Sequence, residues 1–221
     1  MKLVCFGASN PETIRVVNAV KRADEDFEFL GFLDNDESKW GTTFCGYPVF
    51  GGLNEVEALN REGALFCNLI TRDCVTRYET TITLVKAGAK LANLLHPDVN
   101  IEMVQLGLGN YIQENVILQA GVRVGDNSSI HCGSIVSHET SIGNSVFIAP
   151  GCALSGLIVV EDGVFIGTGA TVLPRLRIGK WSTIGAGTVI IRDVPPYSVV
   201  VENPGRVFKN TRITLEDGRV L

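Results

Sequence analysis

Residues 160–190 read VEDGVFIGTGATVLPRLRIGKWSTIGAGTVI, and an aliphatic side chain returns at every sixth position. The same spacing continues back to Leu106 without a break. The aliphatic positions are Leu106, Ile112, Leu118, Val124, Ile130, Val136, Ile142, Ile148, Leu154, Val160, Ile166, Val172, Ile178, Ile184 and Ile190. If about a third of positions were aliphatic by chance, such a run would arise about once in 10⁷ tries. Because neither a helix nor an ordinary strand has a period of six, this internal repeat decides the fold.

Each six-residue unit is expected to form one flat side of a triangular coil, with its aliphatic side chain inside. Three sides make a turn, and stacked turns lie about 4.8 Å apart. The run then forms about five turns, roughly 24 Å of prism. The position four residues after the aliphatic one is compact, as this geometry requires, at Ser128, Ser134, Thr140, Cys152, Ala170, Ser182 and Thr188. The repeat ends at Pro195-Pro196, and we expect residues 197–221 to cap the open end.

Residues 1–95 show a different pattern, in which apolar strands alternate with amphipathic helices. The predicted strands are Lys2–Phe6, Phe27–Leu33, Leu65–Ile70 and Lys90–Leu95, and the predicted helices are Pro11–Ala23, Leu53–Arg61 and Val75–Ala87. Asn10 and Pro11 suit the N-cap and the first helical position. This order predicts a Rossmann-like βαβαβ unit with a parallel sheet. The chain thus divides into an α/β domain, residues 1–95, and a β-helix domain, residues 96–221.

Composition excludes several classes of protein. The 221 residues carry a net charge of −5 and no basic run, which argues against a nucleic-acid partner. No stretch approaches the roughly 18 apolar residues of a membrane span. Six cysteines lack C-x-x-C spacing, and the N-terminus looks like a first strand rather than a signal peptide. We therefore expect free thiols and a cytoplasmic protein.

The repeat resembles that of the hexapeptide acyltransferase superfamily. The ending from Asp193-Val-Pro-Pro-Tyr-Ser through Asn203-Pro204-Gly205-Arg206 is similar to the terminus of that superfamily. With the α/β unit ahead of the coil, the chain resembles a sugar acetyltransferase family. Its members include the bacterial UDP-4-amino-sugar N-acetyltransferase of bacillosamine synthesis and the sialic acid O-acetyltransferases.

The resemblance implies that the coil is a left-handed parallel β-helix, a handedness that the period alone does not give. It also implies an acetyl-CoA-dependent N-acetyltransferase acting on a nucleotide-linked amino-sugar of the 4-amino-4,6-dideoxy type, for surface glycan synthesis. The alternative that it leaves open is O-acetylation of a sugar of the sialic acid type. No metal is expected.

A His-Glu pair performs the chemistry in that family, and the matching residues here are His138 and Glu139. The resemblance makes His138 the general base and Glu139 the residue that raises its basicity. Neighbours on a straight strand point to opposite faces, so the two side chains can cooperate only where the backbone bends. They follow the inward Val136 by two and three places, where a corner of the coil is expected.

The resemblance also implies a nucleotide-sugar site at the ends of the strands of the α/β unit. The matching positions are Ser9, Asn10, Pro11, Asp34, Asn35 and Thr71. The family often shows G-A-G-G-H or G-A-S-G-H at the first turn, and this chain has G-A-S-N-P. The turn also lacks the later glycines of an NAD fingerprint, so we interpret it as a phosphate site at a helix N-terminus.

Positions matching the CoA contacts of the family are Phe147, Gly156, Thr168 and Ala186, and Phe147 stands where the family can place a histidine. Residues 18 apart stack, so Gly156 lies one turn beyond His138, whereas Thr168 and Ala186 share a column on another side. A single convex prism cannot enclose a ligand between two of its own sides, because these sides face away from each other. We therefore expect a cyclic oligomer, most simply a homotrimer, with each site between subunits.

Three other classes of protein fit the sequence less well. A zinc lyase resembling the γ-type carbonic anhydrases would use three histidines, two of them five residues apart, but His131 and His138 are seven apart. A non-enzymatic scaffold would leave the His-Glu pair and the α/β unit without a role. A nucleotidyltransferase would need a longer first domain with a glycine-rich loop and a basic residue.

Overall fold

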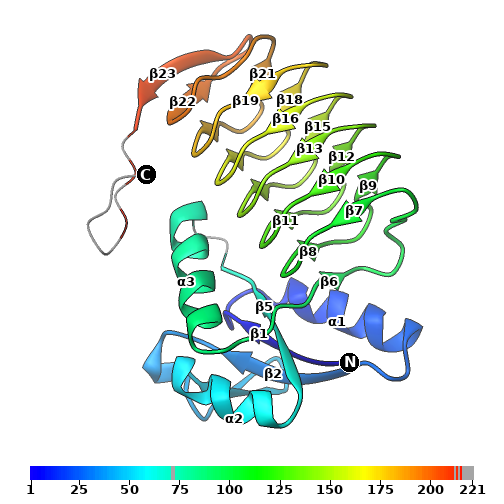
Figure 1. The fold of residues 1–221 in the computed structure, drawn as a ribbon, viewed down its shortest axis with the longest axis vertical. Coiled ribbons are helices and arrows are strands. Elements are labelled where there is room, and N and C mark those ends of the chain that lie inside the picture. The colour runs from blue at the N-terminus through cyan, green and yellow to red at the C-terminus, as the bar shows by residue number, and fades with distance from the viewer. Residues whose placement is uncertain (71–72, 212, 214, 216–221) are drawn as a thin grey trace.

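A computed structural model describes residues 1–70, 73–211, 213 and 215. Figure 1 shows two parts, an α/β unit that holds the N-terminus and a stack of short strands that rises from it. Helix α3, Cys74–Lys86, belongs to the α/β unit and stands beside the stack. No helix in the described ranges is long and apolar enough to cross a membrane.

The α/β unit is built on a five-stranded sheet of order β3-β4-β2-β1-β5. Its strands are β1 Lys2–Phe6, β2 Glu28–Leu33, β3 Thr43–Phe44, β4 Tyr47–Gly51 and β5 Ala64–Asn68. Its helices are α1 Glu12–Ala23, α2 Val56–Arg61 and α3 Cys74–Lys86, with short 3₁₀ turns η1 Glu37–Lys39 and η2 Leu53–Glu55.

Strand β1 occupies the centre of this unit. Leu3, Val4, Cys5 and Phe6 are all buried, as expected for a parallel strand covered on both faces. Leu3 and Cys5 pack with the cluster that includes α1, and Val4 and Phe6 with the cluster that includes α2 and α3. The parallel pairs β1–β2 and β1–β5 confirm the predicted Rossmann-like unit.

Two features of the α/β unit differ from the expectation. The small β3–β4 hairpin was not predicted, and β4 adds a further parallel strand beside β2. The predicted last strand, Lys90–Leu95, is split, so that prediction was wrong. Leu91 only bridges Phe66, whereas Leu94–Leu95 forms β6 and pairs with β8, Tyr111–Ile112, of the coil. The division at residue 95, which stays a prediction, thus follows a strand that already belongs to the coil.

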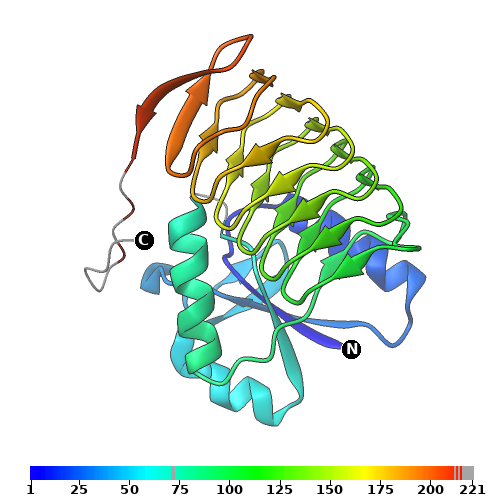
Figure 2. The ribbon, with the colours of Figure 1, turned by 45° about the horizontal axis from the view of Figure 1, so that its top comes forward.

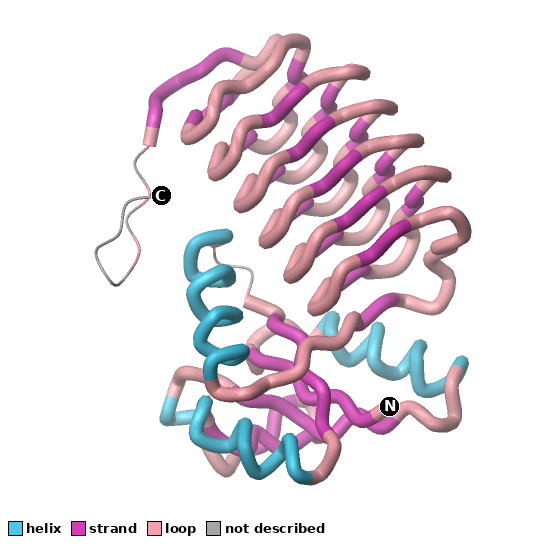
Figure 3. The backbone as a smooth tube through the Cα atoms, viewed as in Figure 1, coloured by secondary structure: helices cyan, strands magenta, loops and turns pink. Residues whose placement is uncertain are grey.

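The coil is a left-handed parallel β-helix whose short strands form three sides (Figure 2, Figure 3). The first side contains β7 Gln105–Leu106, β10 Arg123–Val124, β13 Ser141–Ile142, β16 Val159–Val160 and β19 Arg177–Ile178. The second side contains β6, β8 Tyr111–Ile112, β11 Ser129–Ile130, β14 Phe147–Ile148, β17 Phe165–Ile166, β20 Thr183–Ile184, β22 Ser198–Val201 and β23 Arg206–Asn210. The third side contains β9 Ile117–Leu118, β12 Ile135–Val136, β15 Ala153–Leu154, β18 Thr171–Val172 and β21 Val189–Ile190.

The repeat behaves as its period predicts. Paired residues are 18 apart, as in Val124 with Ile142 on the first side. Of the fifteen aliphatic positions, Leu106 at the start of the run is half-buried and the others are buried. The ladder ends with β22, which pairs in parallel with β20, and with β23, which turns back antiparallel to β22.

Candidate active site

His138 and Glu139 occupy the corner between the third and first sides, after β12 and before β13. Glu139 adopts a left-handed conformation, with φ of 56°, and this bend places its Oε2 3.4 Å from Nδ1 of His138. The backbone is fixed by neighbouring turns, because the His138 N–H donates to Oε1 of Gln119 and the Glu139 N–H donates to the Ala120 carbonyl. The corner thus brings together two side chains that a straight strand would separate.

Gly156 lies directly beneath the imidazole of His138, as the 18-residue spacing predicts. A Cβ on Gly156 would be 2.5 Å from Nε2 and 2.7 Å from Cε1 of the ring. The backbones are also joined, since the Leu157 N–H donates to the His138 carbonyl. The absence of a side chain at Gly156 therefore makes the space in which the ring rests.

This corner is open on its outer side. The side chains of His138 and Glu139 are 55% and 64% exposed in the single chain. Thr168 and Ala186 are exposed too, but they lie at the corner between the second and third sides, where the Gly187 N–H donates to the Thr168 carbonyl. The structure therefore groups the predicted site residues of the coil on two different corners of one prism.

Phe147 lies apart from both corners. Its ring stacks on Phe165 with centroids 5.0 Å apart, is 4.6 Å from the ring of His131, and is 8% exposed. The two phenylalanine rings stand on the outer face of the second side, in one apolar cluster with Cys74. The structure does not bring Phe147 together with Gly156 or Thr168, and a CoA contact there stays a prediction.

The turn after β1 and the end of β2 meet through Asp34, which is 8% exposed. Oδ2 of Asp34 accepts from the Ala8 N–H at 2.8 Å and from Nζ of Lys39 at 2.8 Å. Oδ1 of Asn10 accepts from the Glu12 N–H at 3.0 Å. The helix begins at Glu12, so Pro11 and not Asn10 occupies the N-cap position, and the predicted cap was wrong by one residue. Asp34 therefore holds the shape of the turn, and Lys39 is a site residue that the sequence reasoning missed.

The other predicted nucleotide-sugar positions surround this turn. Ser9, Pro11 and Asn35 are exposed beside it, and Thr71 lies outside the described residues. The helix that follows this turn contacts the coil, because Arg15 of α1 pairs with Glu114, which follows β8, at 3.6 Å. An acceptor held there would thus lie at the junction between the two parts of the chain.

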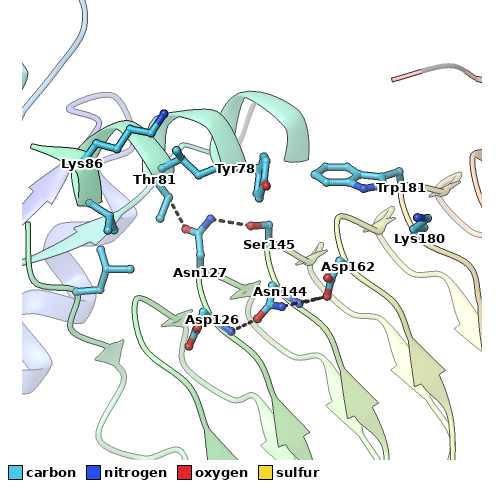
Figure 4. A pocket seen from close by; sticks show the side chains of 13 residues that line it. Tyr78, Thr81, Lys86, Asp126, Asn127, Asn144, Ser145, Asp162, Lys180 and Trp181 are labelled. Atoms are coloured by element: carbon cyan, nitrogen blue, oxygen red, sulfur yellow. Dashed lines mark hydrogen bonds between the residues drawn. The ribbon is translucent and has the colours of Figure 1, made fainter. Parts of the chain in front are cut away.

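A separate groove of about 590 Å³ lies between α3 and the corner that joins the first and second sides (Figure 4). Its floor is a ladder in which Oδ1 of Asn144 accepts from the Asp126 N–H and Oδ1 of Asp162 accepts from the Asn144 N–H. Trp181, edge-on to Tyr78 of α3, lines one end. Because this corner carries none of the predicted site residues, the groove is distinct from the candidate site.

Comparison with known proteins defines the class. The family model described as bacterial transferase hexapeptide (six repeats) matches residues 158–192. These residues of the coil therefore carry the hexapeptide repeat that the model describes.

One curated relative is the acyl-[acyl-carrier-protein]–UDP-N-acetylglucosamine O-acyltransferase of Paracoccus denitrificans. It is 34% identical over 104 residues, which cover 44% of this chain and 40% of the relative. The chain thus spans less than half the length of this relative.

Solved structures match nearly the whole chain. PerB from Caulobacter crescentus, solved with CoA and GDP-perosamine, has a TM-score of 0.83 and 27% identity, over 95% of this chain and 98% of its own. The acetyltransferase domain of PglB from Neisseria gonorrhoeae FA1090 has a TM-score of 0.81 and 28% identity, over 94% and 99%. The same domain has also been solved with acetyl coenzyme A. The combination of an α/β unit with a hexapeptide coil is therefore shared with sugar acetyltransferases.

Proposed function

We propose that this protein is an acetyl-CoA-dependent N-acetyltransferase that acts on a nucleotide-linked amino-sugar. The observation that carries the proposal is the corner at which Glu139 meets His138 above Gly156, in a chain that matches PerB along 95% of its length. PerB was solved with CoA and a nucleotide-linked amino-sugar, the two substrates that this reaction needs.

His138 is the general base of this reaction. With Nδ1 directed at Glu139, the ring carries its proton on Nδ1 and presents Nε2 as the acceptor. Nε2 takes a proton from the sugar amine as the nitrogen attacks the thioester carbonyl. The tetrahedral intermediate then expels the thiolate of CoA, which takes the proton from Nε2 of His138, and the products are the amide, free CoA and the neutral base. Glu139 holds the ring in the productive orientation.

The acceptor lies at the turn after β1. The exposed turn that precedes α1 lies at the N-terminal end of the helix dipole, which suits a diphosphate, and Asp34 keeps the turn in shape. Ser9, Asn10, Pro11 and Asn35, with Thr71, complete this site. The sugar of the 4-amino-4,6-dideoxy type then reaches toward the coil, and the product serves surface glycan synthesis.

We further propose a homotrimer with sites between subunits. The outer face of the third side presents Ile117 and Ile135, which are 50% and 38% exposed. Leu173 and Ile191 extend this apolar face, each 41% exposed. It lies between the His138 corner and the Thr168 corner. Three copies that bury it around one axis would place His138 of one chain against Thr168 of the next.

In this trimer the pantetheine arm of acetyl-CoA runs between Gly156 of one chain and Thr168 and Ala186 of the next. Small or short side chains at these positions let the backbone approach the ligand. We also place the enzyme in the cytoplasm, because all six cysteines are free, as a reducing compartment favours.

The direct test measures release of the CoA thiol from acetyl-CoA with UDP-, GDP- and dTDP-linked 4-amino-sugars. His138→Ala should lower kcat by about 10²–10⁴ and leave CoA binding nearly intact. His96→Ala is the matched control, because His96 lies at the start of the coil, away from the corner, and it should keep normal turnover. Near-normal kcat in His138→Ala would remove this base from the mechanism. Acetylation of sialic acid in place of the amino-sugars would favour O-acetylation.

Assembly is tested by mixing two inactive variants, His138→Ala and Thr168→Trp. The mixed trimers should regain activity where an intact His138 corner meets an intact Thr168 corner, about one interface in four. No recovery in mixed trimers that native mass spectrometry detects would mean that each site belongs to one chain.

A further inference from the structure

Arg77 lies in the first turn of α3 with its side chain inside the molecule, and the residue is 1% exposed. Its Nε donates to the Asn127 carbonyl at 2.7 Å, and its Nη2 donates to the Ser128 carbonyl at 3.5 Å. Its Nη1 donates to the Ile70 carbonyl at 3.1 Å. One guanidinium therefore joins helix α3, the coil and the segment that follows β5.

A second set of hydrogen bonds, centred on Asn68 and Thr81, supports this junction. Nδ2 of Asn68 donates to the Arg77 carbonyl and to Oγ1 of Thr81, and its Oδ1 accepts from the Ile70 N–H. Thr81 in turn donates to Oδ1 of Asn127 at 2.9 Å, as Figure 4 shows. Because Asn68 is completely buried, these bonds fix the end of β5 relative to the coil.

The charge of Arg77 has no acidic counterpart in the part of the chain that the structure describes. The titratable groups around it are neutral near pH 7. Burial raises the pKa of Cys67 to about 11 and that of Cys74 to about 12. Burial, with the charge of Arg77, lowers the pKa of His131 to about 4. The three carbonyl dipoles only partly offset a buried cation, so a positive field remains for a nearby anion.

The place for that anion is the turn after β1. Ile70 packs against Gly7, since a Cβ on Gly7 would be 3.8 Å from the Ile70 nitrogen. Gly7 opens the turn at which the proposed function puts the acceptor diphosphate. We propose that Arg77 is a positioning residue for the acceptor, which fixes the segment after β5 to the coil and favours a diphosphate-bearing substrate by its charge. This inference rests on the proposed function.

The test compares Arg77→Gln and Arg77→Lys with the wild type by calorimetry. The probes are UDP, GDP and dTDP, the matching uncharged nucleosides, and acetyl-CoA. Arg77→Gln should lower the affinity for the preferred nucleoside diphosphate by about tenfold or more. It should lower the affinity for the matching nucleoside by less than about threefold. CoA affinity should not change, because its proposed site lies at other corners. Arg77→Lys should keep most of the preference for the diphosphate.

Both variants should also lower kcat, because the hydrogen bond to Ile70 changes and the amine is misplaced. The matched control is Lys86→Gln, which removes a positive charge from the far end of the same helix and should change neither affinity nor kcat. If Arg77→Gln does not fold, as judged by circular dichroism, Arg77→Lys decides, through a lower kcat at unchanged CoA affinity.

The outcomes separate this inference from the proposed function. Equal losses for diphosphate and nucleoside, or no loss, would overturn the role of the charge, and normal kcat in Arg77→Lys would overturn the positioning. A wild-type protein that binds CoA but no nucleoside diphosphate would instead overturn the proposed class of acceptor, and this inference with it.

Discussion

Replacing Gly156 by alanine tests whether the glycine exists to seat the catalytic imidazole. The new Cβ would lie 2.5 Å from Nε2, 2.7 Å from Cε1 and 3.0 Å from Cδ2 of His138. Non-bonded heavy atoms pack at about 3.5–4.0 Å, so the ring must move by about 1 Å. Because its side chain is 55% exposed, the ring can swing toward solvent without disturbing the core.

A displacement of about 1 Å at a catalytic group can cost about 10²-fold in rate, or about 2.7 kcal/mol of transition-state stabilisation. Gly156→Ala should therefore lower kcat by about 10²-fold while the thermal midpoint moves little. The measurement is CoA thiol release at saturating acetyl-CoA, with a melting curve for the same preparation.

The control is the same substitution in a His138→Ala background. With the imidazole gone, the Cβ meets no ring, and Gly156→Ala should change the residual rate by less than about twofold. If the two substitutions instead lower the rate independently, Gly156 acts through another group, such as the bound CoA. That result would refute the reasoning from the ring contact.

Two further predictions follow from buried groups. The folded-state pKa of His131, about 4, lies below its usual 6.5, so its contribution to stability is present above pH 6.5 and is lost as the pH falls toward 4. The loss amounts to about 3 kcal/mol. When the free energy of unfolding is measured in urea at pH 7 and at pH 4.5, it should fall less in His131→Gln than in the wild type. Equal falls in the two proteins would count against a buried, neutral His131. Asp34→Ala removes the acceptor for Ala8 and Lys39 and should raise KM for the nucleotide-sugar more than it lowers kcat, as steady-state kinetics would show. A rise in KM for acetyl-CoA instead would show that Asp34 supports the binding of acetyl-CoA and not of the nucleotide-sugar.

The coil was predictable because every side of it requires the same feature of the sequence. One aliphatic side chain must fill the interior of each side, so the inward column from Leu106 to Ile190 could be counted directly. Stacking at 18 residues then placed Gly156 beneath His138, although the two are not neighbours in sequence. The bend at Glu139 followed from the position of the corner.

Contacts between distant segments could not be predicted in this way. Strands β3 and β6 have two residues each, too short for any periodicity. Arg77 reads as an ordinary helical arginine, and its partner Asn127 is 50 residues away. The burial of Phe147 depends on the neighbouring second-side rings and on how the α/β unit packs there, which no local pattern encodes.

The 18-residue turn also sets which changes of chain length this protein can tolerate during evolution. An insertion or deletion of one whole turn between Thr140 and Phe165 would lengthen or shorten the stack but leave Thr168 at the same corner relative to His138. A change of six residues would rotate everything downstream by a third of a turn and carry Thr168 to another corner. The antiparallel strand β23 lies on the last rung of the second side, so added turns would not expose a new parallel edge there. Coil length can therefore change in steps of 18 without moving a site residue to another corner. A step between His138 and Thr168 shifts the two by one rung, about 4.8 Å, along the axis, so only turns added beyond both residues leave the catalytic geometry unchanged.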